Sequence, residues 1–140
     1  MTHTLSDFPL QTYDKLRFAD TDSQGHVNSA VFSTFLETGR AEMLYDAEAP
    51  LVAEGAVYVI AKLDLQLLGE VRWPGRVDIG TGVLKVGNSS MTLYQQLYQN
   101  EQCVATAETI IVQMNETTRK SQPLSSQAKE ALSRFLLTQA

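Results

Sequence analysis

The 140-residue sequence predicts an α+β domain in which a five-stranded antiparallel sheet curves around one long helix. Two observations lead to this prediction. One extended segment precedes a long helical segment, and four more extended segments follow it with mostly short connections. Short connections favour antiparallel neighbours, because parallel strands need a long crossover. The helical segment is apolar on one face and carries further apolar residues elsewhere, so we expect it to pack against the sheet.

Composition narrows the classes of function. The formal net charge is -5 and no lysine- or arginine-rich run occurs, which argues against a nucleic-acid partner. No apolar stretch approaches the roughly 18 residues of a membrane-spanning helix. The single cysteine, Cys103, leaves no internal disulfide and is typical of a reducing compartment. We therefore expect one domain over residues 1–140, located in the cytoplasm.

The first part of the chain is predicted to be a tail, a strand and a turn. Residues 1–9 show no hydrophobic period and are expected to form a loose tail. Alternating apolar residues over 10–18 predict a half-buried strand. A tight turn is expected at 22–25, because Asp suits the first position of a type I turn and Gly the fourth. Asn28 or Ser29 then supplies an oxygen that can cap a helix.

The long helix is predicted over residues 29–45. Its main apolar face consists of Phe32, Phe35, Leu36, Gly39 and Met43. Further apolar residues lie off this face, so the helix is expected to be largely enclosed. Glu37 and Arg40 are three residues apart on it. They form either a solvated pair or a pair that needs partners, because ionised groups on an enclosed helix must be compensated.

Period-two patterns predict the remaining four strands, at residues 57–67, 77–83, 91–98 and 104–114. The last of these is apolar on both faces and is expected to be central. Gly80 and Gly82 indicate either bends in their strand or room for a close ligand. After Pro123, Ser125 or Ser126 can cap a closing helix.

Few motifs carry chemistry. The G-x-S-x-G motif of many hydrolases is absent. The two histidines, His3 and His26, have neither an H-E-x-x-H motif nor a cysteine pair, so no metal site is expected. Cys103 is interpreted as a small hydrophobic residue rather than a nucleophile. What stands out is Asp22, one short turn before a helix N-terminus whose free N–H groups can bind and polarise an oxygen.

The polar residues around this turn also have structural interpretations. Asp22 is a turn former or a chemical base, since aspartate commonly stabilises such turns through its side chain. Asn28 is a helix cap or a group that orients a water or a carbonyl. Asp20 can pair with Arg17 or with Arg40. The residues themselves leave these alternatives open.

A family resemblance favours the chemical interpretation. The stretch 17–28, with its D-x-D-x-x-G-H-V-N block, is followed by Phe35-Leu36-Glu37 and Arg40. It resembles the signature of hot-dog-fold acyl-CoA thioesterases of the 4-hydroxybenzoyl-CoA thioesterase type, and the likeness extends over about residues 12–123. The resemblance implies a hot-dog fold, with the sheet wrapped round the helix, two subunits paired edge to edge, and active sites at the dimer interface. It also implies a homodimer or a dimer of dimers.

The resemblance assigns roles to individual residues. Asp22 matches the family's catalytic carboxylate, acting as general base or nucleophile. The backbone N–H near Ser29 matches the group that polarises the thioester carbonyl, and Asn28 lies beside it. Many members carry a second asparagine at Ser29, and a histidine-assisted branch carries Tyr-His in place of Asn28-Ser29.

The implied activity is hydrolysis of an acyl- or aroyl-CoA, with coenzyme A as part of the substrate and no separate cofactor. Some relatives bind its phosphates with arginines at the turn between the third and fourth strands. Candidate contacts in this chain are Lys85, Asn88, Ser89, Ser90, Arg119 and Lys120. Two alternatives remain. A hydratase or dehydratase on acyl thioesters would need a better-placed histidine than His26, and an intact Asp22 argues against a non-catalytic acyl-CoA sensor.

Overall fold

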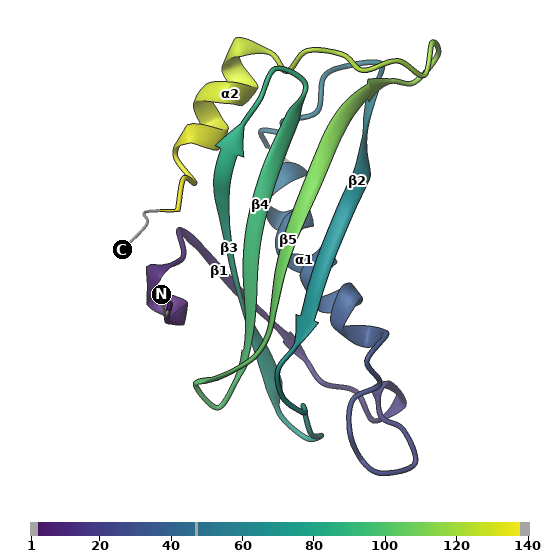
Figure 1. Ribbon diagram of the computed structural model, residues 1–140, viewed down its shortest axis with the longest axis vertical. Helices are drawn as coiled ribbons and strands as arrows, with labels where there is room; N and C mark the ends of the chain where they lie inside the picture. Colours follow the sequence, from purple (N-terminus) through teal and green to yellow (C-terminus); the bar gives the residue numbers. More distant parts are fainter. Residues whose placement is uncertain (1–2, 47, 138–140) are drawn as a thin grey trace.

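The computed structural model describes residues 3–46 and 48–137, and it confirms the predicted fold class. Five strands form one antiparallel sheet in the order β1-β3-β4-β5-β2, with helix α1 across one face (Figure 1). The strands are β1 (Leu10–Lys15), β2 (Ala56–Leu67), β3 (Arg76–Val86), β4 (Ser90–Gln99) and β5 (Gln102–Asn115). The helices are α1 (Val31–Leu44) and α2 (Ser126–Ser133), with 3₁₀ turns η1 (Leu5–Asp7) and η2 (Phe18–Asp20).

Strand order explains the hydrophobic patterns. Hairpins join β3, β4 and β5, while β1 and β2 form the two edges, so the chain crosses the sheet through α1. β4 is the middle strand. β5, which was predicted to be central, lies one place from the middle and is paired on both sides, which accounts for its apolar character. β1 ends at Lys15 rather than at residue 18, and Phe18 is 73% exposed in η2.

Helix α1 packs closely on the inner face of the sheet at Gly39. A Cβ atom at this position would lie 2.6 Å from Thr81 Oγ1 and 2.7 Å from Gln95 Nε2. Gln95 is fully buried and donates to Thr81 Oγ1 and to the carbonyl of Leu36, each at 3.0 Å. The sheet therefore presents a fixed polar pair beneath the helix, and only glycine fits above it.

The two ends of the described chain pack against β3 on the outer face of the sheet, which corrects the predicted loose tail and one of the two interpretations of Gly80 and Gly82. Phe8 is 2% exposed, so the segment from η1 to Phe8 is packed rather than a loose tail; residues 1–2 lie outside the described residues. A Cβ atom on Gly80 would lie 2.6 Å from the Phe8 ring, and one on Gly82 3.0 Å from Leu137. The room beside these glycines is filled by the chain's own side chains and not by a ligand.

Helix α1 packs against β1, β3 and β4 but leaves much of edge strand β2 uncovered. We call the inner-facing side chains of this strand the β2 strip: Tyr58, Ile60, Leu63, Leu65 and Leu67. Tyr58 and Leu65 pack against the core, whereas Ile60, Leu63 and Leu67 are 50%, 39% and 51% exposed. An exposed apolar row on an edge strand is a feature that proteins normally cover.

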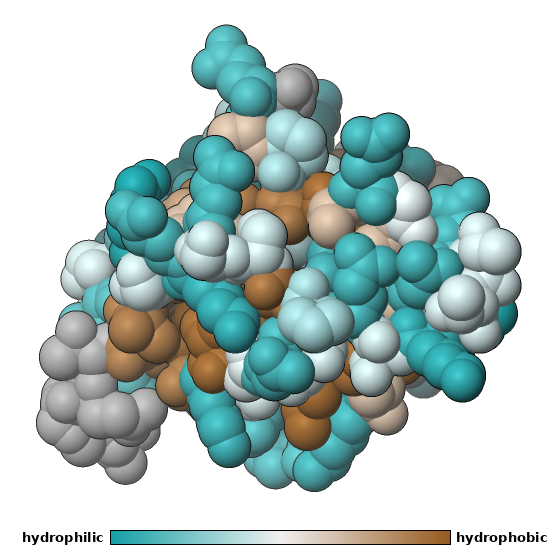
Figure 2. Space-filling model, turned by 90° about the horizontal axis from the view of Figure 1, so that it is seen from above, coloured by the Kyte–Doolittle hydropathy of each residue, from teal (hydrophilic) through white to brown (hydrophobic). Residues whose placement is uncertain are grey.

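The end of the molecule that carries α2 is mostly hydrophilic, with apolar side chains showing between the polar ones (Figure 2). Ser125 caps α2 by accepting a hydrogen bond from the Ala128 N–H at 3.0 Å, as predicted. Within the described part of the chain, no helix is long and apolar enough to cross a membrane.

Candidate active site

The turn predicted at residues 22–25 forms, and Asp22 organises it. Its carbonyl accepts from the Gly25 N–H at 3.2 Å, and Gly25 adopts a φ of 81°, which glycine tolerates best. Its Oδ1 accepts from the N–H groups of Gln24 at 2.8 Å and His26 at 3.2 Å. Oδ2 has no hydrogen-bond partner among the described residues. One carboxylate oxygen therefore holds the turn while the other stays available.

The loop around Asp22 is anchored on both sides. The Asp22 N–H donates to the His26 carbonyl at 2.8 Å, and the Val27 N–H donates to the Val71 carbonyl at 2.7 Å. Val27 is buried in the core together with Val71. The Asn28 N–H donates to the Asp20 carbonyl at 2.8 Å. These bonds hold Asp22 in place from neighbouring segments, as a positioned catalytic group requires.

Asp20 pairs with Arg17 and not with Arg40. It is 4% exposed and accepts from the Arg17 N–H at 3.0 Å and from Arg17 Nη2 at 2.8 Å. Burial opposes ionisation of Asp20, but the hydrogen bonds and charge of Arg17 outweigh it and hold the pKa of Asp20 below its usual range. Asp20 is thus a structural anchor of the loop.

The start of α1 leaves one backbone donor free. The helix begins at Val31, two residues later than predicted. Of the two predicted capping residues, Asn28 provides the side-chain oxygen: its Oδ1 accepts from the Ala30 N–H, just before the helix, at 3.0 Å. The Asn28 carbonyl accepts from the Val31 N–H at 2.9 Å. Within the described chain, the Ser29 N–H and the Asn28 side-chain amide have no acceptor. A helix start with a free N–H is a site for an oxygen that carries negative charge.

Asp22, Asn28 and Ser29, the three predicted catalytic residues, line one pocket of about 330 Å³, which we call the Asp22 pocket. Its wall comes from the turn, the start of α1 and the end of β2. The lining residues are Asp22, His26, Val27, Asn28, Ser29, Phe32, Leu67, Gly69 and Glu70. The volume falls within the range of small-molecule sites. No group of three or more histidine, cysteine or acidic residues among those described is arranged to hold a metal ion.

Glu70, which lines this pocket, and its partner Arg72 beside it had no signal in the sequence. Glu70 lies 3.1 Å from His26 Nε2 and 3.3 Å from Arg72 Nη2, each measured to its Oε2. The segment after β2 reaches the turn through an isolated bridge between His26 and Arg72. Only the pairing of distant segments brings these side chains together, so local patterns could not reveal them.

The proposed coenzyme A contacts lie elsewhere. Lys85, Asn88, Ser89 and Ser90 are at or beside the β3–β4 turn, at the opposite end of the sheet from the Asp22 turn (Figure 1). Strand β3 runs from Arg76 to Val86, which spans about 33 Å at 3.3 Å per residue. The Asn88 carbonyl accepts a hydrogen bond from the Leu124 N–H, and the Ser89 carbonyl accepts one from the Gln113 N–H, each at 2.8 Å. Within one chain, these residues and Asp22 do not share a site.

Comparison with known proteins identifies the class. The profile of the Thioesterase-like superfamily matches residues 16–132. An acyl-CoA thioester hydrolase, YbgC, from Escherichia coli O6:H1 is 26% identical over 115 residues, covering 80% of this chain and 83% of that protein. The PA5185 protein of Pseudomonas aeruginosa PAO1 superposes with a TM-score of 0.87 at 18% identity, covering 98% of both chains. A thioesterase from Thermus thermophilus, solved with coenzyme A and zinc, gives a TM-score of 0.80 at 21% identity over 96% of this chain and 98% of that one.

The fold and the family match therefore define a thioester-cleaving enzyme of the hot-dog fold. The chain belongs to the thioesterase-like superfamily, which confirms the predicted kinship with hot-dog acyl-CoA thioesterases. It is a thioesterase.

Proposed function

We propose that this enzyme hydrolyses acyl-CoA thioesters in the Asp22 pocket. The observation that carries the proposal is that Asp22 and Ser29 line one pocket, and each offers a group with no partner among the described residues: a carboxylate oxygen and a backbone N–H. Hydrolysis of a thioester requires both a group that activates or delivers the nucleophile and a donor for the oxyanion. Coenzyme A is part of the substrate in this proposal, consistent with the names of two similar proteins.

The backbone at the start of α1 stabilises the developing charge. The thioester carbonyl oxygen accepts from the Ser29 N–H, at the positive end of a 14-residue helix. One such donor is worth about 2.7–4 kcal/mol in another hydrolase. The Asn28 amide, which has no acceptor among the described residues, orients the carbonyl or the attacking water from the same wall.

Asp22 supplies the attack by one of two routes. As a base, it takes a proton from water, hydroxide adds to the carbonyl carbon, and the tetrahedral oxyanion collapses with cleavage of the C–S bond. Coenzyme A leaves as a thiolate and is then protonated. As a nucleophile, the carboxylate itself expels the thiolate and forms an anhydride, which water hydrolyses. Isotope labelling of the carboxylate distinguishes the two routes.

The enzyme is proposed to act as a homodimer, or as a dimer of dimers, joined through β2. This 12-residue edge strand has an exposed apolar strip, and pairing with a second copy would cover its free edge. Antiparallel pairing about a two-fold axis would also bring the Lys85 end of one copy toward the Asp22 end of the other. Lys85, Asn88, Ser89 and Ser90 could then contact coenzyme A across the interface. A solution mass near the 15.5 kDa of one chain, with activity retained, would rule this assembly out.

A hydratase is the second candidate, and one observation favours it. His26 lines the pocket and its Nε2 lies 3.1 Å from Glu70 Oε2, an arrangement that orients an imidazole for proton transfer. Water addition to an enoyl-CoA would consume the conjugated double bond without releasing thiol. Hydrolysis would release thiol and leave the double bond in the acid product.

The test is therefore a panel of saturated, unsaturated and aromatic acyl-CoAs assayed for free thiol and for enoyl absorbance. Thiol release that depends on Asp22 supports the proposed hydrolysis. Loss of enoyl absorbance without thiol release assigns the hydratase instead. Tight acyl-CoA binding with neither reaction would make the protein a sensor.

A further inference from the structure

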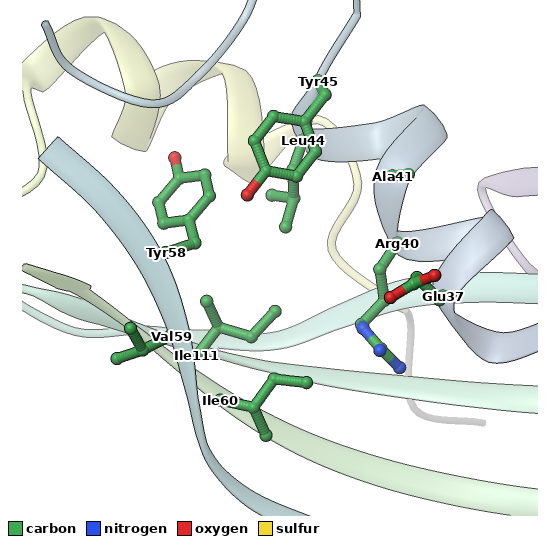
Figure 3. A pocket seen from close by; sticks show the side chains of 9 residues that line it. All are labelled: Glu37, Arg40, Ala41, Leu44, Tyr45, Tyr58, Val59, Ile60 and Ile111. Carbon is green, nitrogen blue, oxygen red and sulfur yellow. The ribbon is translucent and has the colours of Figure 1, made fainter. Parts of the chain in front are cut away.

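A second pocket between α1 and β2 contains an arginine that the proposed reaction does not use (Figure 3). Arg40 is 8% exposed, and its Nη1 atom is buried without a hydrogen-bond partner among the described residues. Glu37, one turn earlier, is the carboxylate that acts on it most, yet the two form no ion pair. Burial lowers the pKa of Arg40 and Glu37 opposes this, but a guanidinium stays charged in proteins. A buried charge without a full set of partners is costly unless a ligand completes it.

This second pocket, the Arg40 pocket, is small, and apart from Arg40 and the exposed carboxylate of Glu37 its lining is aliphatic or aromatic. Its volume is about 160 Å³, and it is lined by Glu37, Arg40, Ala41, Leu44, Tyr45, Tyr58, Val59, Ile60 and Ile111. An engineered cavity of about 150 Å³ in another protein holds one benzene molecule. The Arg40 pocket therefore suits the end of a longer ligand rather than a whole cofactor. Figure 3 shows the Arg40 side chain extending from α1 toward the sheet, with Tyr45 and Tyr58 at the other side.

The buried polar groups of this pocket that lack a partner among the described residues are hydrogen-bond donors, so a ligand that fits them must supply an acceptor. Arg40 offers only donors. The Tyr58 hydroxyl is also buried without a partner among the described residues, and burial raises the pKa of Tyr58 to about 12, so it stays protonated. Figure 3 shows this hydroxyl on the side away from Arg40, so the charged group of a ligand is assigned to Arg40 alone. Carboxylates match the planar guanidinium in shape and charge.

The Arg40 pocket and the Asp22 pocket both lie between α1 and β2. Both are bordered by α1 and β2: the Asp22 pocket at Phe32 and Leu67, the Arg40 pocket near Ile60, with the β2 strip between them. Eleven residues separate Ser29, which holds the thioester, from Arg40, or about 16 Å along a helix. An extended chain advances about 1.1–1.2 Å per bond, so about fourteen bonds span this distance. Helical side chains lean toward the N-terminus, which brings the Arg40 side chain nearer to the Ser29 N–H and makes fourteen an upper limit.

We propose that Arg40 binds a carboxylate on the acyl group, so that the preferred substrates are CoA monothioesters of dicarboxylic acids whose free carboxylate lies up to about fourteen bonds from the thioester carbonyl. This inference rests on the proposed acyl-CoA hydrolysis. The thioester is held at Ser29, the methylenes lie along the β2 strip, and the free carboxylate reaches the guanidinium.

The rate test compares pairs of acyl-CoAs of equal length, one ending in a carboxylate and one in a methyl group. The measured quantity is the ratio of their kcat/KM values over a length series. A charge-assisted bond to buried Arg40 predicts a wild-type ratio of about tenfold to 150-fold at the matching length. Arg40→Met should bring the ratio to one or below. Arg40→Lys keeps the charge without the planar fork and should retain part of the ratio.

Two features keep this test informative. Methionine removes a buried charge that has no ion-pair partner among the described residues and fills similar space, so the Arg40→Met variant is expected to fold. Arg134→Met is the matched control, because Arg134 lies at the exposed end of α2 and pairs only with Glu130 among the described residues. This control should keep the wild-type ratio.

A binding measurement separates this inference from the proposed function. Calorimetry compares S-(ω-carboxyalkyl)-CoA with S-alkyl-CoA thioethers, which cannot be hydrolysed. Tighter binding of the carboxylate form that disappears in Arg40→Met supports the site, even if the wild type were to hydrolyse nothing and the proposed function failed. Equal wild-type preference for both ends, in rate and in binding, would overturn it. So would an Arg40→Met variant that loses both ligands equally and halves the solution mass, because Arg40 would then face a second copy.

Discussion

Asp22→Asn is the substitution that most directly separates the two roles of this residue. Asparagine keeps an Oδ1 acceptor for the N–H groups of Gln24 and His26, which lie 2.8 and 3.2 Å from it in the native turn. It also suits the same turn conformations. What it removes is the charge and the basicity of Oδ2, the oxygen with no partner among the described residues. The substitution therefore changes chemistry while leaving the geometry of the turn.

The two roles predict very different magnitudes. Two backbone bonds to a carboxylate become two bonds to a neutral amide, and because the site is exposed the free energy of unfolding should change by less than about 1 kcal/mol. If Asp22 is the base, kcat should fall by about 10²–10⁴, equivalent to about 2.7–5.5 kcal/mol of barrier. If it is the nucleophile, the loss should be at least as large. Single-turnover hydrolysis in heavy-oxygen water would then place label on the wild-type carboxylate.

The chain contains a matched control. Asp46 Oδ1 accepts from the N–H groups of Glu48 at 2.8 Å and Ala49 at 3.3 Å, a similar pair of side-chain-to-backbone bonds at an exposed position after α1. Asp46→Asn changes charge and turn in the same way but lies outside the Asp22 pocket. We expect both variants to melt near the wild type and only Asp22→Asn to lose hydrolysis. A folded Asp22→Asn variant with a near-native rate would refute the mechanism.

Three further substitutions probe the support of the site. Asn28→Ala should cost about 0.5–2 kcal/mol of stability through the lost bond to Ala30, and kcat should fall further than stability explains; normal turnover would reduce Asn28 to a cap. Gly39→Ala should destabilise by about 1–3 kcal/mol in denaturant unfolding, because its Cβ would lie 2.6 Å from Thr81 Oγ1, whereas exposed Thr34→Ala should have little effect. Asp20→Asn should lower stability at neutral pH by about 1.5 kcal/mol. Because the folded-state pKa of Asp20 is lowered, this difference should shrink as the pH falls below about 4, and a pH-independent difference would contradict the ion pair.

The sequence predicted most elements because their signals are local. The alternation that predicted a strand at 57–67 corresponds to β2 at Ala56–Leu67, and the apolar face of the long helix is the face that α1 buries. Phe8 escaped prediction for the opposite reason. Nothing near it in the chain shows that it will fill the space above Gly80, since that contact joins the segment after η1 to strand β3.

The same distinction applies to the candidate site. Asp22, Asn28 and Ser29 were predictable because they are close in sequence, and one turn places all three in one pocket. Glu70 reaches His26 only because the segment after β2 returns to the turn. The pairing of Asp20 was open between two arginines, and only the 3₁₀ turn after Arg17 directs it to the nearer one.

The uncovered side of α1 connects the proposed substrate site with the proposed assembly. The helix packs on three strands and leaves the exposed side chains of the β2 strip uncovered. In the two proposals, strand β2 both pairs with a second copy and borders the acyl chain. These two uses do not compete. Edge pairing engages backbone N–H and C=O groups in the plane of the sheet, whereas side chains stand perpendicular to it. Two β2 edges can therefore join while Ile60, Leu63 and Leu67 still face the space beside α1, where the second copy would help to exclude water from the reaction.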